Sequence, residues 1–357
     1  MTPGRHGGRT PVPVWAVVLA LVIPAGGSFL AVDGRGPTEP RAGGTASPPL
    51  SRREPSPSPR TSPEPSPEPS PEPKGSLLLH GTGDVSLDPS YISSYASQGY
   101  DYAWSGVDGL FRRDDLTVVN LECAVSNQGS PVPKEFNFRG DPDALPAMLD
   151  AGVEVANLGN NHSYDYGPDA LRDTVRNVEE AGIAAVGAGA DQERALAPAL
   201  LELRGWRVAV VGLDQVVDPF PQAVATASKP GTAAGHDTDP MIDAIRAAAD
   251  QADIVVVMIH WGVELDTQPR AEQVALAHRM IDAGADVIFG GHSHRLQPMD
   301  TYRGRPIFYS LGNFVWPTFS AEGSATAVAE VTVTPQGTFR GRLLPALITA
   351  PGHPELV

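Results

Sequence analysis

The chain has 357 residues, of which 41% are hydrophobic, 6% aromatic and 19% charged, a length that suits one large domain or two small ones. Its formal net charge of −16 and its pI near 4.9 argue against binding to nucleic acid, which requires a basic surface. A single cysteine excludes a disulfide scaffold, a zinc ribbon and an iron–sulfur centre.

Residues 1–32 have the layout of an export signal. Arg5 and Arg9 precede a stretch without charge from residue 10 to residue 32, and Pro24 with small residues after it resembles a cleavage region. The same stretch is long enough, as a helix, to cross a bilayer. Two alternatives remain, a cleaved signal peptide and a retained signal anchor. Both predict an extracytoplasmic protein, either secreted or anchored to the cell membrane by its N-terminal segment.

Residues 33–75 have the composition of a spacer. The segment 37–74 holds 13 of the 36 prolines, repeats the motif Ser-Pro-Glu-Pro, and has balanced charges. Such a segment buries too little apolar surface to fold and favours the extended polyproline II conformation. We predict a disordered linker rich in Pro, Ser and Glu. The remainder of the chain, from residue 75, then carries a net charge of about −18.

From residue 76 onward, short apolar runs alternate with helical patterns, which is typical of an α/β fold. Gly152, Gly182 and Gly284 each follow a helical pattern, as C-terminal caps do, and the pair Asp239-Pro240 suits an N-cap followed by a first turn. A late hairpin with strands 327–334 and 338–344 is predicted to close the fold. The other predicted strands are 77–80, 117–121, 153–157, 208–213, 254–259, 287–289 and 307–309, and the predicted helices are 141–151, 169–181, 239–251 and 270–283.

Residue types that often bind metals follow five of these strands. In α/β sheets, ligand sites collect at the carboxyl ends of the strands. Carboxylates and neutral imidazoles together suit Mn, Fe or Zn, and neighbouring glycines let the backbone turn sharply beside an ion. We therefore predict one shared polar site with a divalent metal. It is formed by Asp84, Glu122, Asn161 with His162, His260, and His292 with His294.

The order of these motifs, from about residue 77 to residue 316, resembles that of the CapA family of poly-γ-glutamate capsule synthesis proteins. That family is similar to the calcineurin-like metallophosphoesterases. The resemblance implies a four-layer α/β/β/α sandwich over residues 76–350, with the site at one edge of the stacked sheets. The matching segments are Gly83-Asp84, Asn120-Leu121-Glu122, Lys134 with Phe136 and Phe138, Asn160-Asn161-His162 with Asp165-Tyr166-Gly167, His260-Trp261-Gly262-Val263-Glu264, Gly291-His292-Ser293-His294 with Gln297-Pro298, and Tyr309–Phe314.

The resemblance also implies roles within the site. His162 falls where the superfamily has a histidine near the leaving-group oxygen, so it is the candidate general acid. Lys134 and Arg139 are candidates to hold an anionic substrate, or else are solvated surface cations. The candidate metal ligands are Asp84, Glu122, Asn161, His260, His292 and His294. The candidates to support these ligands are Asp165, Glu264 and Asn313, although Glu264 is equally interpretable as a surface carboxylate.

Two motifs depart from the superfamily pattern. Ser86 stands where the superfamily's Asp-x-His motif has its histidine. Ser163 stands where a carboxylate follows the motif histidine, unless Asp165 takes that place. We therefore expect one or two ions rather than a fixed pair.

Three interpretations of function follow. The first is a metal-dependent hydrolase or transferase, such as a phosphoesterase, that acts outside the cytoplasm on an envelope polymer or a phosphorylated substrate. The second is a non-catalytic part of an assembly that makes or exports a polyanion, with membrane-bound capsule synthesis partners. The third is a scaffold with a degenerate site, which the retained acids and histidines disfavour. No nucleic-acid partner is expected.

Overall fold

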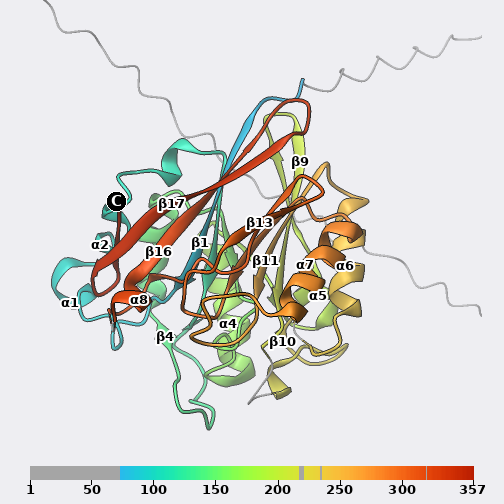
Figure 1. Ribbon diagram of the computed structural model, residues 1–357. Helices are drawn as coiled ribbons and strands as arrows, with labels where there is room; N and C mark the ends of the chain where they lie inside the picture. The colour runs from blue at the N-terminus through green and yellow to red at the C-terminus, as the bar shows by residue number, and fades with distance from the viewer. Residues whose placement is uncertain (1–72, 217–220, 234, 319) are drawn as a thin grey trace, which may run out of the picture. The chain divides into compact units, whose positions relative to one another are not determined.

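The computed structural model describes residues 73–357, apart from 217–220, 234 and 319 (Figure 1). The predicted signal segment and all but the last residues of the predicted linker lie outside these ranges. Within the described ranges, no helix has the length and apolar character that spanning a membrane requires.

The first of two large sheets combines a parallel part with an antiparallel extension. Its strand order is β18-β17-β16-β1-β2-β5-β6, and β15 also pairs with β1. Strands β2 and β15 run parallel to β1, whereas β16 to β18 form an antiparallel meander beside it. The strands are β1 (Leu77–Val85), β2 (Leu116–Leu121), β5 (Val155–Asn157), β6 (Ala184–Val186), β15 (Asn313–Val315), β16 (Ala325–Val333), β17 (Phe339–Ala350) and β18 (His353–Leu356).

The second large sheet has the order β13-β14-β12-β11-β9-β8, with the four central strands parallel and both edge strands antiparallel. Its strands are β8 (Ala199–Leu203), β9 (Trp206–Asp214), β11 (Ile254–His260), β12 (Val287–Gly291), β13 (Met299–Tyr302) and β14 (Arg305–Phe308). Two small pairs join β3 (Ala124–Val125) to β4 (Arg139–Gly140) and β7 (Ala188–Gly189) to β10 (Gly231–Thr232).

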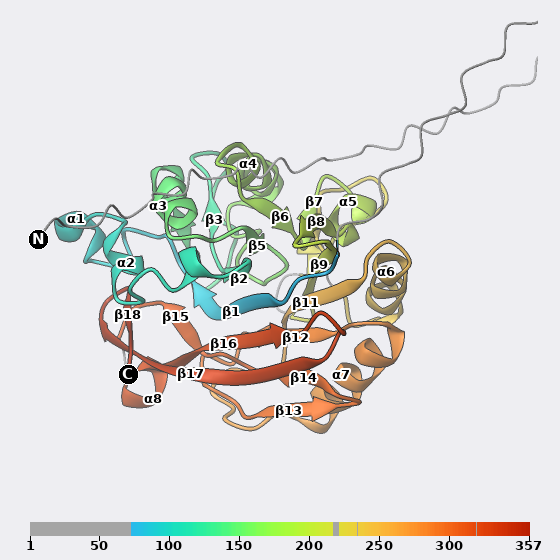
Figure 2. The ribbon, with the colours of Figure 1, turned by 90° about the horizontal axis from the view of Figure 1, so that it is seen from above.

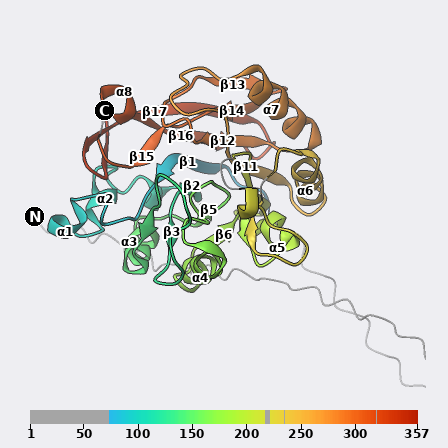
Figure 3. The ribbon, with the colours of Figure 1, turned by 90° about the horizontal axis from the view of Figure 1, so that it is seen from below.

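Helices cover the outer faces of the sheets (Figures 2 and 3). The α-helices are α1 (Tyr95–Gln98), α2 (Tyr102–Ser105), α3 (Leu145–Asp150), α4 (Gly167–Glu180), α5 (Gln192–Leu196), α6 (Asp239–Ala249), α7 (Ala271–Ala283) and α8 (Ala321–Ser324). The 3₁₀ turns are η1 (Phe111–Arg113), η2 (Pro142–Ala144) and η3 (Pro221–Ala223).

Three hydrophobic clusters separate four layers of secondary structure. The central cluster lies between the two sheets, one outer cluster joins the first sheet to α3 and α4, and the other joins the second sheet to α6 and α7. The clusters are separate because side chains alternate along each strand. In β11, Val256 faces the central cluster, whereas Val255 and Val257 face the helices. Strands buried on both faces read as continuous apolar runs. The predicted α/β/β/α sandwich is confirmed.

Most predicted element boundaries agree with the structure to within a few residues. The late hairpin is β16–β17, with its turn at residues 334–338, and Gly152, Gly182 and Gly284 follow helices with positive φ. The predicted N-cap at Asp239 is wrong, because Thr238 holds that position and Asp239 lies in the first turn of α6, where it pairs with Arg279. An acid one position inside a helix still meets the positive end of the helix dipole, which the sequence pattern does not distinguish from a cap.

The parallel strands of both sheets end at one common edge of the sandwich. Stacking aligns that edge of the first sheet with the corresponding edge of the second. Glu122, after β2, accordingly contacts His260, at the end of β11. The fold therefore brings together segments that are far apart in the sequence, as the sequence patterns predicted.

Candidate metal centre

Glu122, directly after β2, has a fully buried carboxylate, and neither of its oxygens has a hydrogen-bond partner among the described residues. Two groups of side chains each place one possible ligand atom per residue within 4.8 Å of one another, and both groups include Glu122. His260 and His292 complete one group, and Asp84 and His294 complete the other. Glu122 thus lies between two adjacent positions that a cation could take.

The first group joins the two sheets. The Nε2 atom of His260, at the end of β11, lies 3.5 Å from Oε1 of Glu122 and 3.0 Å from Nδ1 of His292. The side-chain oxygen of Asn161 lies 2.9 Å from the same Nε2 atom. Two imidazoles, an amide oxygen and a carboxylate therefore converge, which is a donor set that borderline divalent metals accept.

The second group centres on Asp84 in β1. Nδ1 of His294 lies 3.0 Å from Oδ2 of Asp84, and Nε2 of His294 lies 4.0 Å from Oε1 of Glu122. Asn313 is the register partner of Asp84 in β15, and its Oδ1 lies 2.8 Å from Nδ1 of His294. The side chain of Asn313 thus contacts the ring of His294 beside Asp84.

The backbone beside the ligands is shaped for close approach. His292 and His294 have positive φ values of 94° and 52°, which non-glycine residues seldom adopt outside functional turns. A Cβ atom on Gly291 would lie 2.4 Å from Oδ1 of Asp84, so only glycine lets the end of β12 reach β1 here. The two sheets therefore meet at van der Waals distance at the site.

His162 and Asp165 form a second polar unit next to the first group. Nδ1 of His162 lies 2.7 Å from Oδ2 of Asp165, and Nε2 of His162 lies 3.9 Å from Oε1 of Glu122. The ring of Phe138 packs 4.3 Å from the His162 ring, and the backbone N–H of Phe138 donates to Asp165. Asp165 is therefore the carboxylate that contacts the ring of His162.

Burial and neighbouring charges shift the pKa values of the cluster in both directions, and the lowered values of two histidines are the ones that favour metal binding. Burial, with the charge of Asp84, raises the pKa of Glu122 well above 4.5. Burial, with neighbouring imidazoles, lowers the pKa of His260 and brings that of His292 to about 3, so both rings are neutral at pH 7. Burial opposes protonation of His294 as well, but the hydrogen bond to Asp84 raises its pKa above 6.5. Neutral imidazoles have a free lone pair for a metal.

Two residues expected to hold an anionic substrate have other partners. The ammonium of Lys134 is nearly buried and contacts Asp165 and the backbone oxygen of Asn161. The guanidinium of Arg139 donates to the backbone oxygen of Gln128 at 2.8 Å and lies 3.7 Å from the centre of the Tyr166 ring. These contacts join loops beside the site, so they give no support to the expected substrate-binding roles.

Two other residues differ in how closely they approach the cluster. Glu264 is exposed, and its charge adds to the raised pKa of Glu122, after burial and Asp84. Ser86 is buried, and its hydroxyl accepts the backbone N–H of Asp88 at 3.3 Å. The hydroxyl of Ser86 is thus engaged in a local turn.

Two buried residues beside the ligands, Asn120 and Asp214, were not among the predicted site residues. Nδ2 of Asn120 lies 2.8 Å from Asp84 and 3.0 Å from Nδ1 of His260, so this amide links the two sheets behind the ligands. Asp214 ends β9 beside His260 in the register, and burial raises its pKa to about 7. Asp214 closes a parallel strand just as the predicted ligands do, and that signal was available in the sequence.

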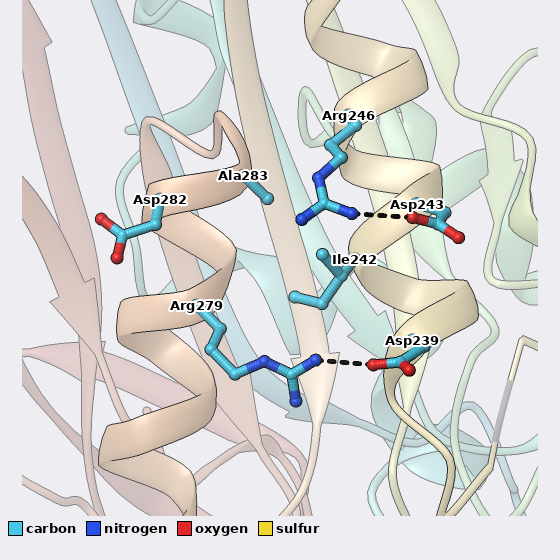
Figure 4. A pocket seen from close by; sticks show the side chains of 7 residues that line it. All are labelled: Asp239, Ile242, Asp243, Arg246, Arg279, Asp282 and Ala283. Atoms are coloured by element: carbon cyan, nitrogen blue, oxygen red, sulfur yellow. Dashed lines mark hydrogen bonds and ion pairs between the residues drawn. The ribbon is translucent and has the colours of Figure 1, made fainter.

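A separate hollow of about 320 Å³ lies between α6 and α7, away from this cluster. Figure 4 shows Arg246 paired to Asp243 and Arg279 paired to Asp239, while Asp282 points away from them. Asp282 pairs with Arg303, so each charged side chain of the hollow has a partner, in contrast to the carboxylate of Glu122 among the described residues.

Comparison with known proteins agrees with the motif order. The family model of bacterial capsule synthesis protein PGA_cap matches residues 79–318. Capsule biosynthesis protein CapA of Bacillus anthracis is 33% identical over 265 residues, which are 72% of this chain and 64% of that protein. PGA biosynthesis protein CapA of Bacillus subtilis is 32% identical over 271 residues, which are 74% of this chain and 69% of that protein.

Solved structures resemble this chain more distantly. NAD nucleotidase of Haemophilus influenzae aligns with 76% of this chain and 50% of its own, at 14% identity and a TM-score of 0.48. Because this TM-score is below 0.5, the description of the fold and of the site depends only on the sheets and side chains of this chain. With its motifs in the family order and two thirds of its length matched by the family model, the chain belongs to the bacterial capsule synthesis protein family PGA_cap.

Proposed function

We propose that this chain acts outside the cytoplasm in the synthesis or export of an anionic envelope polymer, poly-γ-glutamate or a related capsule polyanion, and that it uses a metal site for hydrolase-type chemistry. Family membership supports the first part, since the two Bacillus relatives are named for capsule and PGA biosynthesis. The single observation that carries the second part is the buried carboxylate of Glu122, which has no hydrogen-bond partner within the described part of the chain and is shared by two ligand groups.

The donor set fits a divalent ion of the Mn, Fe or Zn type. A buried carboxylate without a partner is costly in a metal-free protein, and a cation removes that cost. Glu122, His260 and His292, with Asn161, would hold one ion, and Asp84, Glu122 and His294 would hold a second. When bound, such a metal supplies a Lewis acid for a carbonyl or phosphoryl oxygen and lowers the pKa of water.

In this proposal, His162 donates a proton to the leaving group. Its Nδ1 atom is held by Asp165, which leaves Nε2, on the side of Glu122, to carry the transferable proton. Burial lowers the pKa of His162, the Lys134 charge adds to this, and the Asp165 charge opposes it. A lowered pKa makes the protonated ring a stronger acid toward an amide nitrogen or phosphate-ester oxygen.

We propose that membrane-bound capsule synthesis partners of this chain supply the polymer's ligase and export path. The net charge of about −18 after residue 74 repels a polyanion over most of the surface. A polymer end or a phosphorylated substrate would then bind where cations, metal ions included, offset that charge locally.

The test uses the purified full-length chain loaded with Mn or Zn, assayed on γ-linked glutamate oligomers and on nitrophenyl phosphate mono- and diesters. We expect about one or two ions per chain and turnover of one substrate class. His162→Ala lowers kcat about 10²- to 10⁴-fold with the metal retained. The double variant His292→Ala with His294→Ala loses the metal, whereas His278→Ala, on α7, is the matched control.

Each outcome points to one interpretation. Cleavage of the phosphate esters alone favours the metal-dependent phosphoesterase. Metal and polymer binding without turnover favours a non-catalytic polymer-binding scaffold, which the hydroxyl of Ser86 at a usual ligand position also favours. A protein that takes up no metal, and whose melting temperature does not change with Mn or Zn, refutes the proposal.

A further inference from the structure

Lys134 is a buried cation in the loop between β3 and β4. Only 7% of its side chain is exposed, and its ammonium donates to the backbone oxygen of Asn161 at 2.7 Å and to Oδ1 of Asp165 at 2.5 Å. The backbone of this loop is tied to the same place, because the N–H of Val132 donates to the oxygen of Asp165 at 2.8 Å. The ammonium also lies 3.4 Å from Nδ1 of His162, so this contact and both acceptors are within the protein.

Both partners of this ammonium touch the candidate centre. The side-chain oxygen of Asn161 lies 2.9 Å from Nε2 of His260, in the first ligand group. The second oxygen of Asp165 lies 2.7 Å from Nδ1 of His162, the candidate proton donor. One ammonium thus contacts the peptide that presents a ligand and the carboxylate that orients the acid.

We propose that Lys134 is a positioning residue that couples the ligand Asn161 to the proton donor His162, and that it does not hold substrate. This inference rests on the proposed function. A buried ion pair whose members also bond to fixed backbone groups holds its geometry tightly, because breaking it leaves an uncompensated buried charge. Residues behind metal ligands typically change metal affinity or activity about 10- to 100-fold when they are replaced.

The test compares Lys134→Met and Lys134→Arg with the full-length wild type. Lys229→Met is a matched control, because the ammonium of Lys229 also donates to a backbone oxygen, that of Gln222 at 2.6 Å. We expect Lys134→Met to bind Mn at least about 10-fold more weakly by calorimetry and to change the visible spectrum of the Co-loaded protein, which reports ligand geometry. Lys134→Arg, which keeps a charged donor, restores part of the affinity, and Lys229→Met matches the wild type.

Turnover separates positioning from substrate binding. Positioning predicts a lower kcat with little change in KM for Lys134→Met. A higher KM with unchanged kcat, Mn affinity and Co spectrum shows that Lys134 holds the substrate anion, and overturns the inference. If Lys134→Met does not fold by thermal melting, Lys134→Arg decides, because altered Mn affinity or Co spectrum supports positioning and wild-type values for both overturn it.

The inference and the proposed function fail in different ways. A wild type that binds no metal refutes the metal site and the role of Lys134 together. A wild type that binds metal, with Lys134→Met identical to it in affinity, spectrum and kcat, refutes the role of Lys134 alone.

Discussion

At the scale of single residues, the carboxylate of Glu122 is buried and has no hydrogen-bond partner in the ranges that the structure describes. Burial and the nearby charge of Asp84 raise its pKa well above 4.5, so the ionised form is unfavourable in the metal-free protein. Isolated buried charges are costly unless a partner or a metal compensates them. The buried charge of Glu122 therefore lowers the stability of the metal-free protein, and a bound cation would compensate that charge.

We expect Glu122→Gln to stabilise the metal-free protein and to abolish metal binding. The neutral amide removes the buried charge, so stability at pH 8 rises by about 1–3 kcal/mol. Because the folded-state pKa of Glu122 is raised, the wild type loses stability as the pH rises above 4.5, and the variant lacks that loss.

Thermal melting of chelator-treated protein between pH 5 and pH 8 checks this expectation. Asp214→Asn, a buried acid that lies in neither ligand group, is the control for a general effect of neutralising a carboxylate, and it retains the metal. A less stable Glu122→Gln that still binds Mn contradicts the expectation.

At the scale of elements, Glu154 joins three strands of the first sheet just before β5 begins. Its carboxylate accepts the backbone N–H of Thr117 in β2 at 2.7 Å, and its own backbone oxygen accepts the N–H of Ala184 in β6 at 2.8 Å. Burial raises the pKa of Glu154 to about 8, although the bond from Thr117 opposes this. The edge opposite the metal site thus contains a carboxyl group that favours its proton.

We expect the stability of the wild type to fall between about pH 5 and pH 8 because of Glu154. Its pKa is about 8 in the folded state against 4.5 in the unfolded chain, so the folded state holds a proton that the unfolded chain releases in that interval. Glu154→Gln keeps an acceptor for Thr117 and removes this contribution to the slope. Glu154→Ala leaves the N–H of Thr117 without its acceptor and costs about 1–3 kcal/mol.

Urea unfolding at several pH values measures both variants. A wild-type slope that Glu154→Gln leaves unchanged, with Glu154→Ala as stable as wild type, contradicts the assignment.

At the scale of the whole molecule, the ligands come from both sheets. In the first sheet, Asp84 lies in β1 and Glu122 follows β2. In the second sheet, His260 ends β11, and His292 and His294 follow β12. The sheets are held together by the central cluster, in which the ring of Phe289 packs so closely on β1 that a Cβ on Gly81 would lie 2.6 Å from it. The ligand distances therefore depend on the packing of one sheet on the other.

Substitutions at two neighbouring residues of β12 distinguish the effect of sheet packing on the ligand distances from general destabilisation. Phe289 faces the central cluster, and Ile288 faces the cluster under the helices. We expect Phe289→Ala to cost about 3–5 kcal/mol and Ile288→Ala about 2–5 kcal/mol. Only Phe289→Ala should also weaken Mn binding, measured by calorimetry below the melting temperature. Equal Mn affinities for the two variants would show that sheet packing does not control the ligand distances.

Much of the fold and of the site was predictable from local patterns. Apolar runs such as 254–259 mark strands buried on both faces, and parallel strands end at a common edge. The side chains at their ends, such as Asp84, Glu122 and His260, were therefore expected to come close together, and the structure places Glu122 in one ligand group with His260 and in another with Asp84. The alternation of strands and helices likewise determined the layered α/β architecture.

Other features depend on loops and on the stacking of the sheets. A sequence shows a lysine at position 134 but not that the loop between β3 and β4 folds back to bury its ammonium against Asp165. It shows an asparagine at 313 but not that β15 returns beside Asp84 to hold His294.

Periodicity and strand order thus decided which side chains approach the site, because these properties follow from the backbone geometry of each segment. Only the tertiary structure decided their partners, and placed Glu122 between two ligand groups. The reason is that hydrogen bonds and ion pairs form over about 3 Å. Sequence patterns do not specify how loops close and sheets pack at that precision.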